Sequence, residues 1–406
     1  MITAKAFAGK HYAVYGLARS GLATAEALLA SGARVTAWDA KEEAKAKAPA
    51  GTELANLDEA DLSQFDSLVV TPGLPLNRHP IAQRARDAGV EIIGDIELFA
   101  RARPELPPHN VVGITGTNGK STTTALIHHI LKTAGVPATM GGNIGLPILA
   151  QDPLPEGGVY VLELSSYQID LTQSLDCDVA VLLNITPDHL DRYESFEAYA
   201  ASKARLAEMS SGFRFDARKM RAGRWGSTQR EWPSLQGPHN LQNAMAAYAI
   251  GTALELKVEQ IEEGLRTYPG LPHRMERVRE KDGVLFVNDS KATNPTATAP
   301  ALAAFRSIRW ILGGQPKADN LDECAPHFGH VRSAYTIGEA GELFARLLAP
   351  HMPVANCETL ENALNQAAKD SQPGDTVLLS PACASFDQFR DFEQRGDRFR
   401  DLVGAL

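Results

Sequence analysis

The stretch Val111–Thr124, VVGITGTNGKSTTT, constrains the fold more than any other part of the chain. It begins as an apolar run, turns through two glycines and continues into residues typical of a helix. A strand, a glycine-rich loop and a helix in this order aim backbone N–H groups at a bound phosphate. Gly116 and Gly119 allow a tight turn and a close approach of the backbone to an anion. The stretch therefore predicts a nucleotide site inside an α/β sheet.

The side chains of this loop fit the same chemistry. Lys120 can reach terminal phosphates, and the Ser121 hydroxyl can hold Mg²⁺. The general P-loop pattern has a glycine five positions before Gly119, where this chain has Ile114. The sharper pattern is therefore GTNGKS at 116–121, which differs from that of a general P-loop ATPase.

Length and composition indicate a soluble protein of two or three domains. The chain has 406 residues, 44% of them hydrophobic and 22% charged, and a single core rarely extends over that length. A net charge of −9 argues against a general nucleic-acid-binding protein, which needs a basic field. The four cysteines are far apart, so reduced thiols are expected. No leader and no apolar run of about eighteen residues is evident, and a cytoplasmic location without membrane contact is expected.

The first domain is expected to span residues 1–103. A strand at 11–15, the sequence GLARSG at 16–21, a helix to Ala30 and a strand ending at Asp39 form a βαβ unit. Asp39 could accept hydrogen bonds from a ribose or a base. Because an alanine replaces the middle glycine of the dinucleotide fingerprint, NAD, another nucleotide and a purely structural unit all remain open readings.

The second domain is expected to span residues 104–270. Glu163 ends an apolar strand next to the phosphate loop, where a carboxylate is a natural Mg²⁺ ligand. His189 follows the next strand and is a candidate metal ligand or substrate contact. Lys203 lies in a helix predicted over 196–209. The basic, glycine-containing stretch 210–236 has few apolar residues and is expected to be a mobile solvated loop.

The third domain is expected to span residues 271–406, after a hinge at Leu271–Arg274. Strands predicted at 284–287, 309–312 and 375–379 each end in a loop of Asp, Ser, Thr or Lys. This repetition predicts a doubly wound α/β unit with its polar loops at one edge. Such side chains suit an anionic amino-acid substrate, and a final helix over 387–403 closes the unit.

Nine segments together resemble the Mur ligase family over nearly the whole chain. They are GITGTNGKSTT at 113–123, GGNIG at 141–145, VLELSSYQ at 161–168, LNITPDHLDRY at 183–193, SKARL at 202–206, HNLQNA at 239–244, LPHR at 271–274, VNDSKATNP at 287–295 and SPACASFDQF at 380–389. The phosphate loop and the HN motif are typical of the family in general, including folylpolyglutamate synthases. The last two segments resemble those of its D-glutamate-adding ligases. The implied fold is α/β in three domains: a Rossmann-like N-terminal domain, a P-loop-type central ATPase domain, here trimmed, and a doubly wound, Rossmann-like C-terminal domain.

The resemblance implies a defined reaction. ATP phosphorylates the carboxylate of UDP-N-acetylmuramoyl-L-alanine, and the amine of D-glutamate attacks the acyl phosphate, as part of peptidoglycan precursor synthesis. Three anionic groups must then be held together with their charges neutralised. The family pattern implies two Mg²⁺ sites, one at Ser121 and Glu163 and the other at His189 and Lys203. A cationic lysine cannot bind a metal, so the resemblance implies that Lys203 is carbamylated.

The resemblance also implies four sets of site residues. The catalytic set is Lys120, His189 and Lys203. The ATP set is Gly116, Thr117, Asn118, Gly119, Lys120, Ser121, Thr122, Asn243, Arg274, Asp289 and Lys291. The UDP-substrate set is Ser20, Asp39, Thr71, Asn143, Ser165, Gln168 and His189. The D-glutamate set is Thr293, Lys317, Ser385 and Phe386, although GGQPKAD around Lys317 departs from the usual GG-x-x-K-x-x-D spacing.

One departure from the family concerns the central domain. Lys203 and His239 are 36 positions apart (239 − 203), and family members usually carry a considerably longer insert there. We therefore expect a trimmed central domain in a monomer that keeps its activity. The alternatives are another ligase of the same superfamily, a homologue that binds nucleotides without catalysis, and a nicotinamide-dependent oxidoreductase built on the first βαβ unit.

Overall fold

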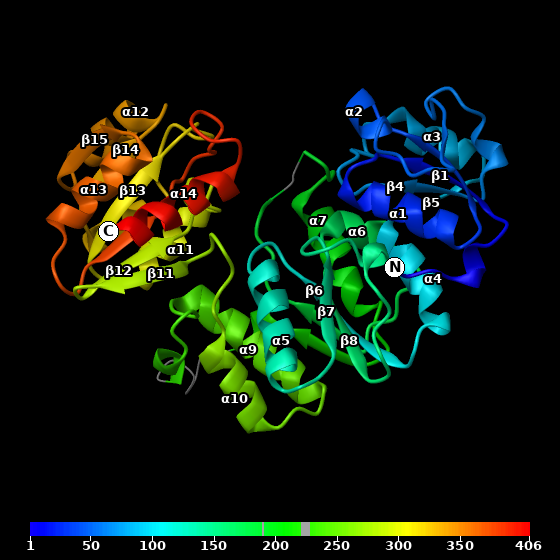
Figure 1. Ribbon diagram of the computed structural model, residues 1–406, viewed down its shortest axis with the longest axis horizontal. Helices are drawn as coiled ribbons and strands as arrows, with labels where there is room; N and C mark the ends of the chain where they lie inside the picture. The colour runs from blue at the N-terminus through cyan, green and yellow to red at the C-terminus, as the bar shows by residue number, and fades with distance from the viewer. Residues whose placement is uncertain (189–190, 221–227) are drawn as a thin grey trace. The chain divides into compact units, whose positions relative to one another are not determined.

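The computed structural model describes residues 1–188, 191–220 and 228–406, which contain three largely parallel β-sheets (Figure 1). The expectation of three α/β domains with Rossmann-like sheets is confirmed. The chain divides into two compact units, Met1–Arg221 with Asn243–Gly264 and Ala222–Gln242 with Leu265–Leu406. The first unit holds the first two sheets. The domain boundaries near residues 103 and 270 stay predictions.

The first sheet has the strand order β3-β2-β1-β4-β5, all parallel. Its strands are β1 (His11–Tyr15), β2 (Arg34–Trp38), β3 (Glu53–Leu54), β4 (Ser67–Val70) and β5 (Glu91–Ile93). Its helices are α1 (Arg19–Ala30), α2 (Glu42–Lys45), α3 (Pro80–Asp87) and α4 (Asp95–Ala102). The strand order reverses between β1 and β4, so the loops that follow these two strands form the crevice where ligands of such sheets bind.

The second sheet has the order β10-β9-β6-β8-β7, also parallel. Its strands are β6 (His109–Thr115), β7 (Ala138–Gly142), β8 (Gly158–Glu163), β9 (Val179–Leu182) and β10 (Phe213–Asp216). The helices are α5 (Lys120–Thr133), α6 (Ser166–Asp170), α7 (Phe196–Ala204), α9 (Pro238–Ala253) and α10 (Val258–Thr267). The predicted phosphate loop joins the central strand β6 to α5.

The first two sheets share one hydrophobic core and a buried polar clamp. Phe99 of α4 packs against Tyr160 of β8, with ring centroids 5.0 Å apart. The buried Glu97 carboxylate of α4 accepts hydrogen bonds from the backbone amides of Gln173 (2.7 Å) and Ser174 (2.8 Å), which follow α6. A buried carboxylate bonded to backbone amides is well satisfied, so this clamp holds the first sheet against the second.

The expectation of a solvated loop over 210–236 is wrong for part of that stretch. Phe213–Asp216 forms β10, which pairs in parallel with β9 at the edge of the sheet. The amide of Phe213 donates to the Asp178 carbonyl (2.8 Å), and the rings of Phe213 and Phe215 stack 6.2 Å apart. A four-residue edge strand needs few apolar residues because only part of it is covered, so composition did not reveal it. A 3₁₀ turn, Ala217–Lys219, follows β10.

The third sheet lies in the second unit and has the order β11-β12-β16-β13-β14-β15. Its strands are β11 (Glu276–Lys281), β12 (Val284–Asn288), β13 (Ile308–Gly313), β14 (Val331–Ile337), β15 (Val354–Glu358) and β16 (Thr376–Leu379). Its helices are α11 (Pro295–Ala304), α12 (Gly341–Leu348), α13 (Leu360–Asp370) and α14 (Phe392–Ala405). Only β11 is antiparallel to its neighbour. The adjacent strands β12, β16 and β13 bring the three predicted polar loops to one edge.

The final helix begins later than expected, because Asp391 caps it. The Asp391 side chain accepts a hydrogen bond from the Gln394 amide (2.8 Å), so α14 starts at Phe392 rather than near Asp387. Residues before the cap therefore remain in the loop that follows β16.

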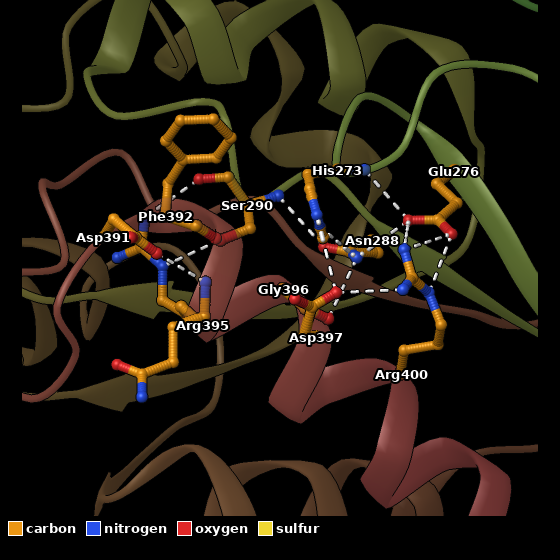
Figure 2. Close-up of polar contacts among 11 residues, drawn as sticks. His273, Glu276, Asn288, Ser290, Asp391, Phe392, Arg395, Gly396, Asp397 and Arg400 are labelled. Atoms are coloured by element: carbon orange, nitrogen blue, oxygen red, sulfur yellow. Dashed lines mark hydrogen bonds and ion pairs between the residues drawn. The ribbon is translucent and has the colours of Figure 1, made fainter. Parts of the chain in front are cut away.

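Arg395 of α14 holds two of the polar loops together from inside the domain, and Figure 2 shows its contact with Ser290 of one of them. Its side chain is 1% exposed and donates to the Ser290 hydroxyl (3.0 Å) and to the carbonyls of Ser290 (3.0 Å), Cys383 (3.0 Å) and Ala384 (3.2 Å). Burial lowers the pKa of Arg395 to about 10, so the guanidinium stays charged at neutral pH. The loops after β12 and β16 thus share a buried cation bonded to their backbones.

We expect the variant Arg395→Met to loosen these two loops. Hydrogen bonds to a charged group contribute about 1.5–3 kcal/mol each, so amide exchange at residues 290–294 and 381–387 should rise at least about tenfold. Hydrogen-exchange mass spectrometry measures this. Arg398→Met is the matched control, because Arg398 on the same helix makes an exposed ion pair with Glu361. Equal exchange in the two variants would contradict the bridging role.

Candidate functional site

The phosphate loop is built by glycines and by an asparagine pair. Gly116 (φ 157°) and Gly119 (φ 84°) adopt backbone angles that other residues rarely accept. The Asn118 amide donates to the Asn184 side chain (2.8 Å), and Asn184 donates back to the Asn118 carbonyl (3.0 Å). Asn184 directly follows Leu183, next to β9, so the neighbouring strand fixes the loop.

Helix α9 contacts the same loop through Asn243. A Cβ atom on Gly119 would lie 2.3 Å from Oδ1 of Asn243, so only glycine permits this approach. Asn243 also accepts a hydrogen bond from the Thr123 hydroxyl of α5 (3.3 Å). Asn243 is therefore placed beside the phosphate loop, as the sequence predicts.

Lys120 lies folded over the phosphate loop. Its Nζ donates to the carbonyls of Gly116 (3.0 Å) and Thr117 (2.9 Å). Thr117 in turn contacts the hydroxyl of Tyr199 on α7 (3.0 Å). Ser121 and Thr122 stand in the first turn of α5, where a helix N-terminus favours anions. The predicted residues Gly116–Thr122 thus form one continuous segment of loop and helix N-terminus, and its contact with ATP phosphates stays a prediction.

Glu163 is a buried carboxylate with one oxygen left unsatisfied by the described residues, an environment that suits a metal ligand. It ends β8 beside Ile114 of β6 and is 2% exposed. Its Oε1 accepts a hydrogen bond from the Asn143 side chain (3.1 Å), whereas Oε2 is buried and has no hydrogen-bond partner among the described residues. An unsatisfied buried carboxylate oxygen is costly. The donor set of Glu163 and the Ser121 hydroxyl is one that Mg²⁺ prefers.

Lys203 of α7 is buried, with 2% of its surface exposed, and its Nζ lies 4.7 Å from the ring centroid of Tyr199. Burial is the main cause that lowers the pKa of Lys203 to about 7, and the charge of Lys120 lowers it further. Nearby carboxylates oppose this shift, namely Asp188, Asp170 and Glu163. A large share of Lys203 is therefore uncharged at neutral pH and can act as a nucleophile.

His189 lies outside the described residues. Among residues 1–188, 191–220 and 228–406, no three His, Cys, Asp or Glu side chains form a metal-binding group. Such a search covers neither a serine hydroxyl nor a modified lysine, so the pairs expected from Ser121, Glu163 and Lys203 stay predictions.

A cavity of about 380 Å³ lies between the first two sheets, close to Glu163. Four residues of the predicted UDP-substrate set line it, namely Ser20, Thr71, Asn143 and Gln168. Arg19, at the start of α1, also lines it and donates to the Gly145 carbonyl across the cavity (2.9 Å). Residues as far apart in sequence as Ser20 and Gln168, 148 positions (168 − 20), therefore converge on one site.

Ser165 and Asp39 differ in how they relate to this cavity. Ser165 caps α6 in a reciprocal pair with Gln168, so the two act together. Asp39 is not among the lining residues, and its two carboxylate oxygens accept backbone hydrogen bonds from Leu17 (2.8 Å) and Lys41 (2.9 Å). Asp39 thus orders the loop after β1, and its expected contact with the substrate stays a prediction.

The predicted D-glutamate residues lie on neighbouring loops of the third sheet. Lys317 Nζ is 3.4 Å from the Thr293 hydroxyl, which joins the loops after β13 and β12. Paired backbone hydrogen bonds between Gln315 and Ala384 (2.9 and 3.0 Å) place the loop before Ser385 beside them. Ser385 is buried, whereas Phe386 is 67% exposed. The role of these residues in binding D-glutamate stays a prediction.

The remaining nucleotide residues lie on a strained segment of the same unit. His273 (φ 62°) and Met275 (φ 50°) flank Arg274 in left-handed conformations that cost on the order of 1–3 kcal/mol. A polar cluster holds His273: Asn288 bonds its Nδ1 (3.1 Å), and Asp397 lies 3.7 Å from its Nε2 (Figure 2). The strained backbone thereby fixes the position of Arg274.

Asp289 and Lys291 occupy the loop after β12. Asp289 is buried and accepts hydrogen bonds from the Ser380 hydroxyl (2.8 Å) and the Met275 amide (3.1 Å). Burial raises the pKa of Asp289 to about 7. Lys291 Nζ lies 3.6 Å from the ring centroid of Phe392. Both residues stand at the carboxyl edge of the sheet, as predicted.

The sequence reading missed several residues that build the site. Tyr199 precedes Lys203 by four positions, which places both on one helix face. This spacing could have predicted that the two side chains meet. Asn184 lies inside the segment LNITPDHLDRY at 183–193, which by itself assigns Asn184 no role. Arg395 gave no signal, because an arginine on an amphipathic helix usually faces solvent.

Three family descriptions match the chain. The Mur ligase MurD-like N-terminal domain matches residues 10–94, the Mur ligase middle domain matches residues 114–215, and the Mur ligase glutamate ligase domain matches residues 273–383. These matches fall one on each of the three sheets.

Curated relatives extend over the whole chain. The UDP-N-acetylmuramoylalanine–D-glutamate ligase of Novosphingobium aromaticivorans is 61% identical over 429 aligned positions, covering 100% of this chain and 97% of that protein. The proteins of the same name from Sphingopyxis alaskensis and Zymomonas mobilis are 58% and 52% identical, covering 100% of both chains. These alignments exceed the 406 residues of this chain, so the relatives carry residues that it lacks.

Solved structures agree on the fold. The MurF ligase of Thermotoga maritima, in complex with ADP, aligns with a TM-score of 0.59 at 17% identity, covering 98% of this chain and 96% of that one. UDP-N-acetylmuramate-alanine ligase MurC of the same organism has a TM-score of 0.57 at 17% identity, covering 98% and 99%. The phosphate loop, the three sheets and the full-length relatives all show that the chain belongs to the Mur ligase family.

Proposed function

We propose that this protein is an ATP-dependent ligase that joins D-glutamate to UDP-N-acetylmuramoyl-L-alanine through an acyl phosphate, in peptidoglycan precursor synthesis. The observation that carries the proposal is the hydrogen bond between Asn143 and Glu163. Asn143 lines the cavity, and Glu163 stands beside the phosphate loop. A substrate carboxylate at the cavity's end would therefore meet the terminal phosphate of ATP. The names of the full-length relatives support the same reaction.

Each group of residues has a role in this reaction. The loop Gly116–Thr122 binds the phosphates of ATP, and Lys120 balances the charge that develops during transfer. Ser20, Thr71, Asn143, Ser165 and Gln168 hold the UDP-substrate. Asn243 lies beside the phosphate loop and contacts the nucleotide, and Arg274, Asp289 and Lys291 are the proposed nucleotide contacts of the second unit. Thr293, Lys317, Ser385 and Phe386 hold D-glutamate.

Ser121, Glu163, His189 and a carbamylated Lys203 would hold Mg²⁺ at two sites. Bound Mg²⁺ supplies positive charge that neutralises the phosphate and carboxylate oxygens. Carbamylation needs an uncharged amine, and burial, which lowers the pKa of Lys203 to about 7, raises the share of that form at neutral pH. Its nitrogen forms a bond to the carbon of CO₂ and releases a proton, which yields an anionic carbamate. That carbamate supplies the oxygen donors that a lysine ammonium lacks.

The cellular location and the partners of the protein follow from its proposed substrates. UDP-sugar precursors and ATP are consumed in the cytoplasm, and we place the protein there as a monomer. No helix in the described ranges is long and apolar enough to cross a membrane. Its partners are small molecules, and the acidic net charge of −9 gives no reason to expect nucleic acid among them.

Phosphate release tests the function. With ATP, Mg²⁺ and UDP-N-acetylmuramoyl-L-alanine, we expect release to require D-glutamate and to stay at background with L-glutamate. The Lys120→Ala variant should lose activity at least about 100-fold, because it removes a charge aimed at the transferred phosphate. Release driven by L-alanine or by a folate substrate would identify a different ligase of the superfamily. Binding of both nucleotides without turnover would identify a catalytically impaired homologue.

Chemical rescue tests the carbamate. We expect Lys203→Ala to reduce turnover at least about 100-fold, because it removes a proposed metal ligand, and formate to restore part of it by replacing the missing carboxylate. Lys132→Ala, at the end of α5, is the matched control and should behave like the wild type. The ¹³C spectrum of protein incubated with ¹³CO₂ should show a carbamate signal that the Lys203 variant lacks. Full activity of Lys203→Ala, or its failure to lose that signal, would refute the assignment.

Magnesium titration tests Glu163. We expect Glu163→Gln to raise the Mg²⁺ concentration for half-maximal activity at least about tenfold, because the amide keeps the size of the side chain but loses its charge. Calorimetric titration of Mg²⁺ into the ATP-bound protein gives a readout independent of turnover. Glu156→Gln, on a distant surface turn, is the control. An unchanged Mg²⁺ requirement would exclude Glu163 as a ligand.

A further inference from the structure

Asp95 is a buried acid in the wall of the candidate UDP-substrate cavity. It is the first residue of α4 and is 5% exposed, and it lines the cavity with Ser20, Thr71 and Gln168. Its Oδ1 accepts a hydrogen bond from the Ile96 amide (3.0 Å). The sequence reading gave Asp95 no role, because an acid at the start of a helix is common.

Gln168 faces Asp95 with a defined orientation. The side-chain Oε1 of Gln168 accepts hydrogen bonds from the amide (3.1 Å) and the hydroxyl (3.0 Å) of Ser165. Its NH₂ group is therefore the end left to donate toward the cavity wall, and a hydrogen bond from Gln168 lowers the pKa of Asp95. Because an amide NH₂ only donates, an ionised carboxylate is its best partner. A chain of contacts thus runs from Ser165 through Gln168 to Asp95, from the second sheet to the first.

The charge of Asp95 is poorly compensated. Burial raises its pKa to about 6, against the opposing hydrogen bonds from Ile96, from its own amide and from Gln168. Among the described residues that line the cavity, the only other charged side chain is Arg19 of α1. The lining residues of the loops after β4 and β7, and of α6, are uncharged. Glu97, two residues further along α4, instead faces Arg101 and the amides of Gln173 and Ser174.

We propose that Asp95 is a positioning residue of the UDP-substrate cavity, whose ionised carboxylate holds the Gln168 amide in the orientation that binds the substrate. The inference rests on the proposed function and adds a regulatory property to the same site. When Asp95 takes up a proton, its carboxyl loses its charge and gains an O–H donor. It then accepts a weaker hydrogen bond from the Gln168 NH₂ group. Affinity for the UDP-substrate then falls as the pH drops through about 6, where the folded protein binds this proton.

The test compares two isosteric variants of neighbouring acids on α4. Asp95→Asn removes the charge inside the cavity, and Glu97→Gln removes the charge of the clamp outside it. Phosphate release measured from pH 5.5 to 8.5 gives KM for UDP-N-acetylmuramoyl-L-alanine and for ATP. Calorimetric titration of the UDP-substrate without ATP gives its affinity independently of turnover.

We expect Asp95→Asn to raise KM for the UDP-substrate about tenfold at pH 7.5, the effect of one hydrogen bond to a charged group, and to leave KM for ATP within about twofold. The wild type should lose substrate affinity below about pH 6, and this acid limb should be absent in Asp95→Asn. Glu97→Gln should lower the melting temperature but keep the wild-type KM and pH profile.

Three outcomes would count against the inference. An unchanged KM and acid limb in Asp95→Asn would overturn it while leaving the proposed function intact. The same KM change in Glu97→Gln would show that Asp95 acts only through the contact between the two sheets. Failure of the wild-type protein to bind the UDP-substrate would overturn the proposed function and the inference together.

Discussion

The parallel pairing of β6 with β8 is the constraint on which the candidate site depends. It sets Ile114, just before the phosphate loop, opposite Glu163, and so puts a buried carboxylate beside the loop that binds ATP. Asn143 then links Glu163 to the cavity between the first two sheets. Backbone hydrogen bonds between two central strands are among the most rigid elements of a fold. The position of Glu163 relative to the phosphate loop is therefore set by the sheet.

Several charged groups are buried without a matching ion pair in the part of the chain that the structure describes. Arg395 bonds backbone carbonyls, Asp95 bonds amides, and Lys203 lies against a tyrosine ring. Groups of this kind cost stability unless their hydrogen bonds are complete. The first two are largely satisfied by neighbouring loops and act as internal braces. Lys203 is not satisfied in the same way, and its lowered pKa opens the modification chemistry proposed for it.

The sequence was sufficient for the fold class and for most of the candidate site, because glycine-rich turns and polar strand ends have local signatures. Gly116, Gly119 and Glu163 could be recognised from their positions relative to apolar runs. Asp95 and Arg395 could not, since their roles depend on burial by segments 73 and 105 positions away (168 − 95 and 395 − 290). β10 was not predicted because a short edge strand has weak periodicity. The ligand role of Asp39 stays a prediction, although its oxygens accept hydrogen bonds from backbone amides.

β10 is the outermost strand of the second sheet in the described part of the chain, and this position bears on self-association. A sheet edge is a template for pairing with another copy. Here the edge is four residues long, and it alternates phenylalanine with Arg214 and Asp216. Asp216 is held by Arg218 (2.8 Å), so charge is fixed at the end of the strand. The edge therefore combines a short strand with fixed charge, two features by which natural sheets limit pairing with other copies.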